Sequence, residues 1–150
     1  MPIISYVYPN LSVFHKQRPS IRGGLTQRWK EARKLNCKYI EVPATLIKNK
    51  TEEKITGLKI GDFLTKKEIS QLYIKETVPE GLKYILHTEP SLKGSKIKWY
   101  DQEWTQKYIE MIIQITEHLS KPAEIIEIHP GNKKNTFHNI CECVEKLIGV

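Results

Sequence analysis

The sequence predicts an α/β fold of four βα units whose strands run parallel. Three observations lead to this prediction. Four short apolar segments are rich in Ile, Val and Tyr, amphipathic helical patterns separate them, and the strands carry one apolar and one semi-polar side. Alternation of strands and helices implies parallel pairing through right-handed crossovers. We expect a single domain over residues 1–150.

The four predicted strands end where turn-rich segments begin. Proline lacks a backbone donor and tends to end a strand, and one proline lies just beyond each apolar segment. The predicted strands are Ile3–Val7, Lys38–Val42, Lys83–His87 and Ala123–His129, and the prolines are Pro9, Pro43, Pro90 and Pro130.

Two helices are strongly indicated. The first begins after Asp101, a good N-cap, and one apolar face continues for about four turns through Trp104, Tyr108, Met111, Ile112, Ile115 and Leu119. The second begins after Thr136 and is expected to bury Phe137, Ile140, Val144, Leu147 and Ile148. Weaker patterns predict helices over Thr26–Lys34 and Thr65–Glu76, and 51–64 is expected to be a loop with at most one helical turn.

Residue alternation places polar side chains on one face of the sheet. Successive strand residues point to opposite faces, so Glu41, His87, Glu127 and His129 share a face opposite the apolar one. A doubly wound sheet would be apolar on both faces. One apolar and one semi-polar face suit a barrel wall. A complete barrel needs eight βα units and ~250 residues, so the chain is predicted to be half of a (βα)8 TIM barrel, a truncated N-terminal portion of a larger one.

Composition restricts the possible environments and partners. Lys and Arg number 24 against 17 Asp and Glu, and this net charge of +7 favours an anionic partner, nucleic acid or a phosphate ester. No apolar run approaches the ~20 residues of a membrane span. Three cysteines argue against a disulfide framework and indicate a reducing, cytoplasmic setting.

Two histidines at strand ends are candidate metal ligands. His87 and His129 end neighbouring predicted strands, where active sites of parallel α/β folds lie. Neutral imidazoles are suitable ligands for zinc. Either histidine alone is more often an ordinary residue bonded to a loop, but the pair in register favours a metal site.

The segment 83–148 resembles the apurinic/apyrimidinic endonuclease IV group of xylose-isomerase-like TIM barrels. The resemblance rests on a strand ending in His87, a long helix, and a strand ending in His129-Pro130-Gly131. It implies that both histidines bind zinc or another divalent metal in a hydrolase that acts on damaged DNA. Over 1–82 it is only topological.

The sequence also departs from that family. His87 is followed by Thr88-Glu89-Pro90-Ser91, where the endonucleases usually have Ala-Pro-Tyr. The family's other ligands come from the second half of the barrel, so this chain is expected to supply only part of the site and to be inactive alone. Glu41, Glu127 and Glu89 are candidates to orient the ligands.

The predicted loops after the strands are basic. Residues 9–24, 43–51, 88–100 and 130–135 contain ten Lys or Arg and one acid, as a phosphodiester backbone would require. The candidate phosphate contacts are Lys16, Arg18, Arg22, Lys93, Lys96, Lys98, Lys133 and Lys134. Trp99 and Tyr100 could stack on a base or sugar, or pack on the following helix.

The sequence therefore favours a metal-dependent phosphodiesterase, with DNA as partner of the parent protein. One alternative is a sugar or sugar-phosphate isomerase or epimerase on the same barrel. The other is an inactive half-barrel that self-associates, because an open half-barrel exposes two strand edges.

Overall fold

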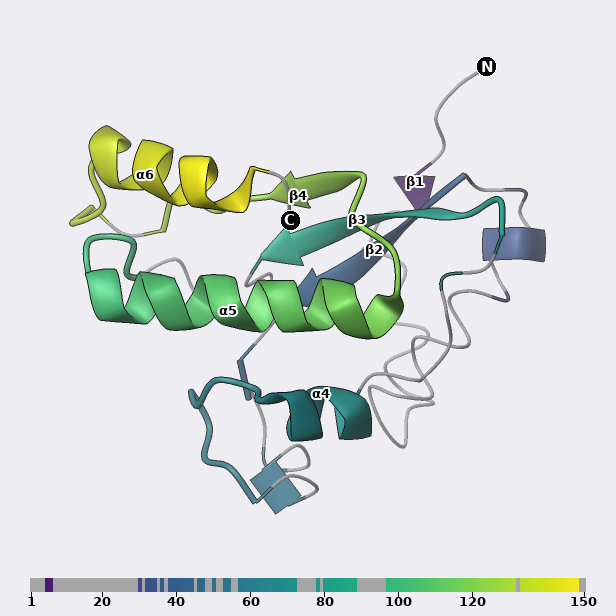
Figure 1. Cartoon of the computed structure of the whole chain (residues 1–150), viewed down its shortest axis with the longest axis horizontal. Helices are drawn as coiled ribbons and strands as arrows, with labels where there is room; N and C mark the ends of the chain where they lie inside the picture. The colour runs from purple at the N-terminus through teal and green to yellow at the C-terminus, as the bar shows by residue number, and fades with distance from the viewer. Residues whose placement is uncertain are drawn as a thin grey trace.

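The computed structural model describes residues 5–6, 30, 32–34, 36, 38–44, 46–47, 50, 53–54, 57–72, 78, 80–88, 97–131 and 133–148. In chain order the elements are β1 (Ser5–Tyr6), β2 (Tyr39–Ala44), α4 (Lys66–Leu72), β3 (Lys83–Thr88), α5 (Gln102–Leu119), β4 (Ile125–Glu127) and α6 (Phe137–Leu147) (Figure 1). Residues 30 and 32–34 are helical, within the predicted Thr26–Lys34 helix. No helix in these described ranges is both long and apolar enough to cross a bilayer.

The strands form one parallel sheet in the order β1-β2-β3-β4. The protein is therefore a mixed α/β protein with parallel pairing, as predicted. In the register, Glu41 lies beside Ile85, and His87 lies beside Glu127. Consecutive strands of the chain are neighbours throughout. Because all three pairings are parallel, the carboxyl ends of the four strands lie at the same edge of the sheet.

Two strand ends differ from the sequence prediction. β2 continues through Pro43 to Ala44, although Pro43 was expected to follow the strand. Proline is tolerated where a ladder bond is not needed, and the described pairing of β2 with β1 ends at Ile40. At the other end of the sheet, β4 stops at Glu127, so His129 lies two residues beyond the strand.

The main core lies between the apolar face of β2 and β3 and the helix α5. The predicted alternation is confirmed in β3, where Tyr84 and Leu86 are fully buried while Ile85 and His87 are partly exposed. All six predicted core residues of α5 are buried. The Tyr108 hydroxyl donates to the carbonyl oxygen of Ala44 at 2.5 Å and so ties α5 to β2.

The ends of the two main helices follow their sequence signals. The side chain of Asp101 accepts a hydrogen bond from the Trp104 amide at 3.0 Å, which satisfies one free donor of the first turn of α5. Thr136 caps α6 and forms a reciprocal capping box with Asn139. The helix expected over Thr65–Glu76 is found as α4, Lys66–Leu72.

The buried face of α6 differs from the prediction. Phe137, Val144 and Ile148 are 82%, 41% and 76% exposed, although all three were expected in the core. Only Cys143 and Leu147 are buried. The reason is that α6 carries two adjacent apolar stripes, and only the one through Ile140, Cys143 and Leu147 packs against the core.

Candidate metal centre

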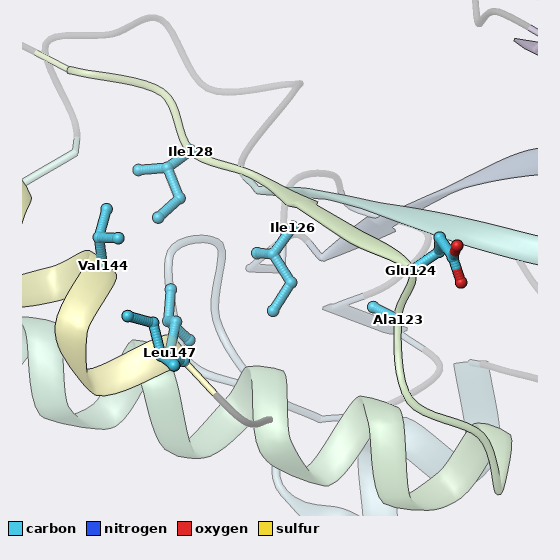
Figure 2. A pocket seen from close by; sticks show the side chains of 7 residues that line it. Ala123, Glu124, Ile126, Ile128, Val144 and Leu147 are labelled. Atoms are coloured by element: carbon cyan, nitrogen blue, oxygen red, sulfur yellow. The ribbon is translucent and has the colours of Figure 1, made fainter.

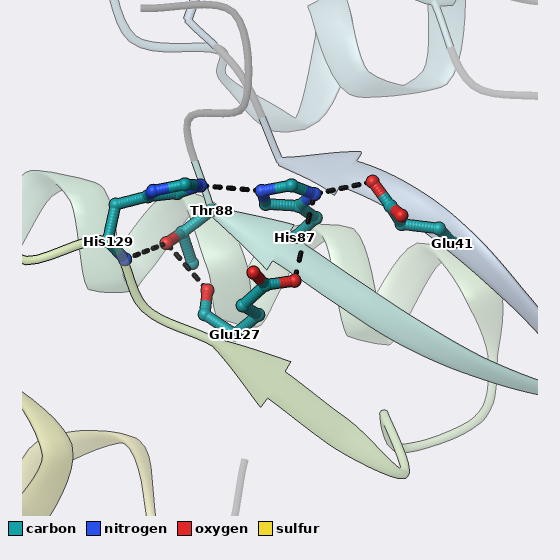
Figure 3. A network of polar contacts seen from close by, with 5 residues as sticks. All are labelled: Glu41, His87, Thr88, Glu127 and His129. Atoms are coloured by element: carbon teal, nitrogen blue, oxygen red, sulfur yellow. Dashed lines mark hydrogen bonds and ion pairs between the residues drawn. The ribbon is translucent and has the colours of Figure 1, made fainter. Parts of the chain in front are cut away.

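Four polar side chains meet at the carboxyl edge of the sheet (Figure 3). Glu41 comes from β2, His87 from β3 and Glu127 from β4, while His129 comes from the segment that follows β4. Their position on one face, opposite the apolar core, follows from the two-residue alternation of each strand. The predicted convergence of His87 and His129 on one face and at one end of the sheet is therefore confirmed.

The two imidazoles face each other through their Nε2 atoms. These atoms lie 2.6 Å apart, and the rings are nearly parallel, with centroids separated by 4.8 Å and an interplanar angle of 17°. Two unprotonated Nε2 atoms would repel each other at this distance. The arrangement therefore requires either a proton shared between the rings or a cation that both lone pairs approach.

Glu41 determines the orientation of the His87 ring. Its carboxylate pairs with Nδ1 of His87, and both side chains are largely buried, at 12% and 16% exposure. This hydrogen bond to Glu41 raises the pKa of His87, against the opposing effect of burial, and the negative charge of Glu127 adds to the rise. With Nδ1–H donated to Glu41, neutral His87 presents its Nε2 lone pair toward His129.

Glu127 brings a carboxylate to the Nδ1 side of the His87 ring. Its Oε2 lies 3.7 Å from Nδ1 of His87, and its side chain is half exposed. The ligand atoms of His87, Glu127 and His129 all lie within 4.8 Å of one another. Glu127, which the sequence predicts as an orienting residue, lies among the possible ligands.

The three residues have the donor atoms that a zinc site uses. Donors ~2.1 Å from zinc in tetrahedral geometry are roughly 3.4 Å apart, so the two Nε2 atoms need to separate by somewhat less than an ångström. The carboxylate of Glu127 would also have to turn from Nδ1 of His87 toward the Nε2 atoms, and its side chain is half exposed. Two imidazoles and one carboxylate also match the ligand set of catalytic zinc sites, which keep a further position for water.

His129 lies beyond the end of β4 and is held by hydrogen bonds with residues from other segments. Its carbonyl oxygen accepts a 2.7 Å hydrogen bond from the indole Nε1–H of Trp99. The Thr88 hydroxyl donates to the carbonyl of Glu127 at 2.7 Å and accepts a longer, 3.4 Å bond from the amide of His129. Sequence analysis did not identify these two tethers, since they join residues 30 to 41 positions apart.

The loop that follows His129 is fixed in the same way. The side chain of Asn135 donates to the carbonyls of Ile97 and Pro130 and accepts from the amide of Tyr100. Gly131 has a positive φ of 78°, and a Cβ there would lie 2.8 Å from the Cβ of Ile97 and collide with Asn135. Glycine in the His-Pro-Gly segment is thus required by backbone conformation and by close packing.

The predicted phosphate-binding residues are described only in part. Lys98, Lys133 and Lys134 are exposed on the two loops joined by Asn135. Lys134 lies over the ring of Tyr100, 5.6 Å from its centroid. The other predicted residues lie outside the described ranges, and they are Lys16, Arg18, Arg22, Lys93, Lys96 and the candidate orienting residue Glu89.

The predicted stacking role of Trp99 is wrong. Its side chain is 2% exposed and packs edge-on against Trp104 and Tyr108, with centroids 5.2 and 5.5 Å away. The alternative prediction, packing on the following helix, is confirmed. Tyr100 is 38% exposed, with Lys134 over its ring, and its predicted stacking role stays a prediction.

This cluster can hold a divalent cation or pass a proton along the line Glu41–His87–His129. Comparison of the chain with protein-family models, with curated proteins and with solved structures gives no match. The chemistry of the site is therefore argued from these residues.

Proposed function

We propose that this chain supplies His87, His129 and Glu127 to a zinc or other divalent-metal centre of a phosphodiesterase that acts on damaged DNA. The observation that carries the proposal is the approach of the two Nε2 atoms, 2.6 Å apart at the carboxyl edge of a parallel sheet, with ligand atoms of His87, His129 and Glu127 within 4.8 Å of one another. The sequential strand order supports the half-barrel architecture, in which catalytic groups lie at this edge.

Each residue has a distinct role in this proposal. When bound, the metal ion would polarise a phosphate oxygen and lower the pKa of a water molecule. Glu41 accepts the Nδ1–H of His87, so that the Nε2 lone pair of His87 could bind a metal ion. Trp99 and Thr88 hold the backbone at His129. Exposed Lys98, Lys133 and Lys134 would position the phosphate backbone.

Zinc titration by calorimetry tests the metal site. We expect the chain to bind one zinc ion, weakly for a zinc protein because it supplies three ligands at most. His87→Ala and His129→Ala should each lower the affinity at least about tenfold. His138→Ala is the matched control, since its side chain is 79% exposed and lies on α6. Equal zinc binding by all three variants and the unchanged chain would exclude the site.

Salt-dependent DNA binding tests the partner. If the basic loops contact phosphates, affinity for an abasic-site duplex should fall steeply with salt, because counterions are released. Lys96→Glu together with Lys98→Glu should reduce the slope of log affinity against log salt by about two. Binding that does not depend on salt, or its absence at low salt, would contradict the DNA proposal.

One observation favours the second candidate, a sugar or sugar-phosphate isomerase or epimerase. Glu41 raises the pKa of His87 and thus favours a protonated imidazole at the mouth of the site. A proton donor in this position suits proton transfer to or from a sugar. Zinc-independent proton exchange into a bound sugar phosphate, lost in His87→Ala, would support this candidate over the nuclease.

A further inference from the structure

The helix α6 and its C-cap residue carry an apolar stripe that the described part of the chain covers only in part. Phe137, Cys141, Val144 and Ile148 follow one another at spacings of 4, 3 and 4 residues. Because each helical residue turns by about 100°, these four lie along one line, roughly a quarter-turn from the core-facing Cys143 and Leu147. Phe137 and Ile148 are 82% and 76% exposed.

An apolar hollow continues this surface onto the sheet. Ile126 and Ile128 point from β4 and its following segment toward Val144 and Leu147 of α6 (Figure 2). With Ala123, Glu124 and Ile148 they line an open cavity of about 370 Å³, in which Glu124 is the one charged residue. β4 is the last strand in the sheet order, so its outer edge has no partner strand among the described residues. The stripe, the hollow and the outer edge of β4 lie together at one side of the molecule.

We infer that a second copy of this chain occupies this surface through a two-fold axis, with the two α6 helices antiparallel. The 4-3-4 spacing is that of a coiled-coil seam. In antiparallel register, Phe137 of one copy lies against Ile148 of the other, and Cys141 lies against Val144. The seam is therefore complementary to itself, as a two-fold interface requires.

Charge and sheet geometry favour the same arrangement. His138 and Glu145 flank the seam on one side, and antiparallel packing brings His138 of each copy close to Glu145 of the other. A two-fold axis perpendicular to the sheet also places the β4 edges of the two copies antiparallel to each other. One symmetry operation thus covers the helix stripe and offers partners to the free strand edge.

The size of the surface determines the expected affinity. α6 has 11 residues, about 16 Å of helix, and β4 has only three residues. Elements this short bury less surface than the roughly 1,200–2,000 Å² of stable complexes. We therefore expect a weak dimer, with a dissociation constant on the order of 10 µM.

Sedimentation velocity over a concentration series tests the inference on the full chain. The unchanged protein should move from monomer to dimer as its concentration rises, and Phe137→Lys should weaken association at least about tenfold. Ile60→Lys is the matched control, since Ile60 is also exposed, at 44%, and lies outside α6. A chain that stays monomeric at several hundred micromolar, or an equal effect of both variants, would overturn the inference.

A charge exchange tests the antiparallel orientation. Glu145→Lys should weaken the dimer, because it replaces the acidic neighbour of His138 in the other copy with a basic one. Adding His138→Glu should restore association, because the two introduced side chains carry opposite charges and face each other. Failure of the double variant to recover would contradict the antiparallel arrangement. None of these outcomes depends on metal binding, so the dimer and the metal centre can fail independently.

Discussion

Two halves of the same sheet are packed very differently. Around β2, β3 and α5, the rings of Phe63, Trp99, Trp104 and Tyr108 form one cluster with centroids 5.0 to 6.5 Å apart. Around β4 and α6, large apolar side chains remain exposed, Phe137 at 82% and Ile125 at 51%. Both helices are amphipathic and well capped, so the difference comes from what lies opposite them and not from helix propensity.

The candidate metal centre lies at the boundary between these halves. His87 belongs to the well-packed half, where it pairs with Glu41. His129 follows the lightly packed β4 and is held through Trp99 and Thr88, both of which are buried in the other half. The site thus depends on hydrogen bonds that fix His129, in the lightly packed half, to buried residues of the well-packed half.

The strongest test of this comparison is one substitution made in both halves. Ile112 of α5 is fully buried and Ile148 after α6 is 76% exposed. Ile112→Ala should lower the free energy of unfolding by about 2–5 kcal/mol through lost burial and a cavity. Ile148→Ala should change it by less than about 0.5 kcal/mol. Urea denaturation at low protein concentration measures both, and similar losses would show that the two halves are equally packed.

Removal of the hydrogen bond from the Trp99 indole to His129 tests how the two halves are joined at the metal centre. Trp99→Phe keeps an aromatic ring in the cluster but loses the donor to the carbonyl of His129. We expect a stability loss of about 1–2 kcal/mol and a several-fold loss of zinc affinity, because His129 is less restrained. Trp104→Phe is the matched control, since it removes an indole from the same cluster without touching His129. Equal zinc affinities of the two variants would exclude the positioning role of Trp99.

The sequence predicted the well-packed half better than the lightly packed one. Asp101 and the apolar spacing gave the start and the buried face of α5, because a single stripe meets a single core. α6 has two stripes, and the sequence contains no signal for which one is covered. Strand alternation placed Glu41, His87, Glu127 and His129 on one face. It could not reveal Thr88 and Trp99 as tethers, because their contacts arise only when distant segments meet.

A smaller effect concerns the pH dependence of the metal-free protein. The hydrogen bond to Glu41 raises the pKa of His87 above its ordinary 6.5 in the folded state. Protonation of His87 therefore stabilises the fold fully below about pH 6.5, and this contribution disappears as the pH rises through the raised value. With chelator present, the urea midpoint should decrease across that interval, and Glu41→Gln should flatten the decrease. An unchanged slope in Glu41→Gln would show that the pair does not contribute.

The smallest expected effect is a difference in thiol reactivity that reports how firmly α6 is held. Burial raises the pKa of Cys143 to about 11, whereas Cys141 is partly exposed on the same helix. At about pH 8 a thiol reagent should therefore modify Cys141 first, as peptide mapping by mass spectrometry can show. Modification of Cys143 requires α6 to open. If α6 is held as lightly as its exposed stripe indicates, Cys143 should react through local opening, at a rate that low urea hardly changes. A Cys143 rate that follows global unfolding would mean that α6 is docked as firmly as α5, and the contrast between the two halves would then be one of surface and not of stability.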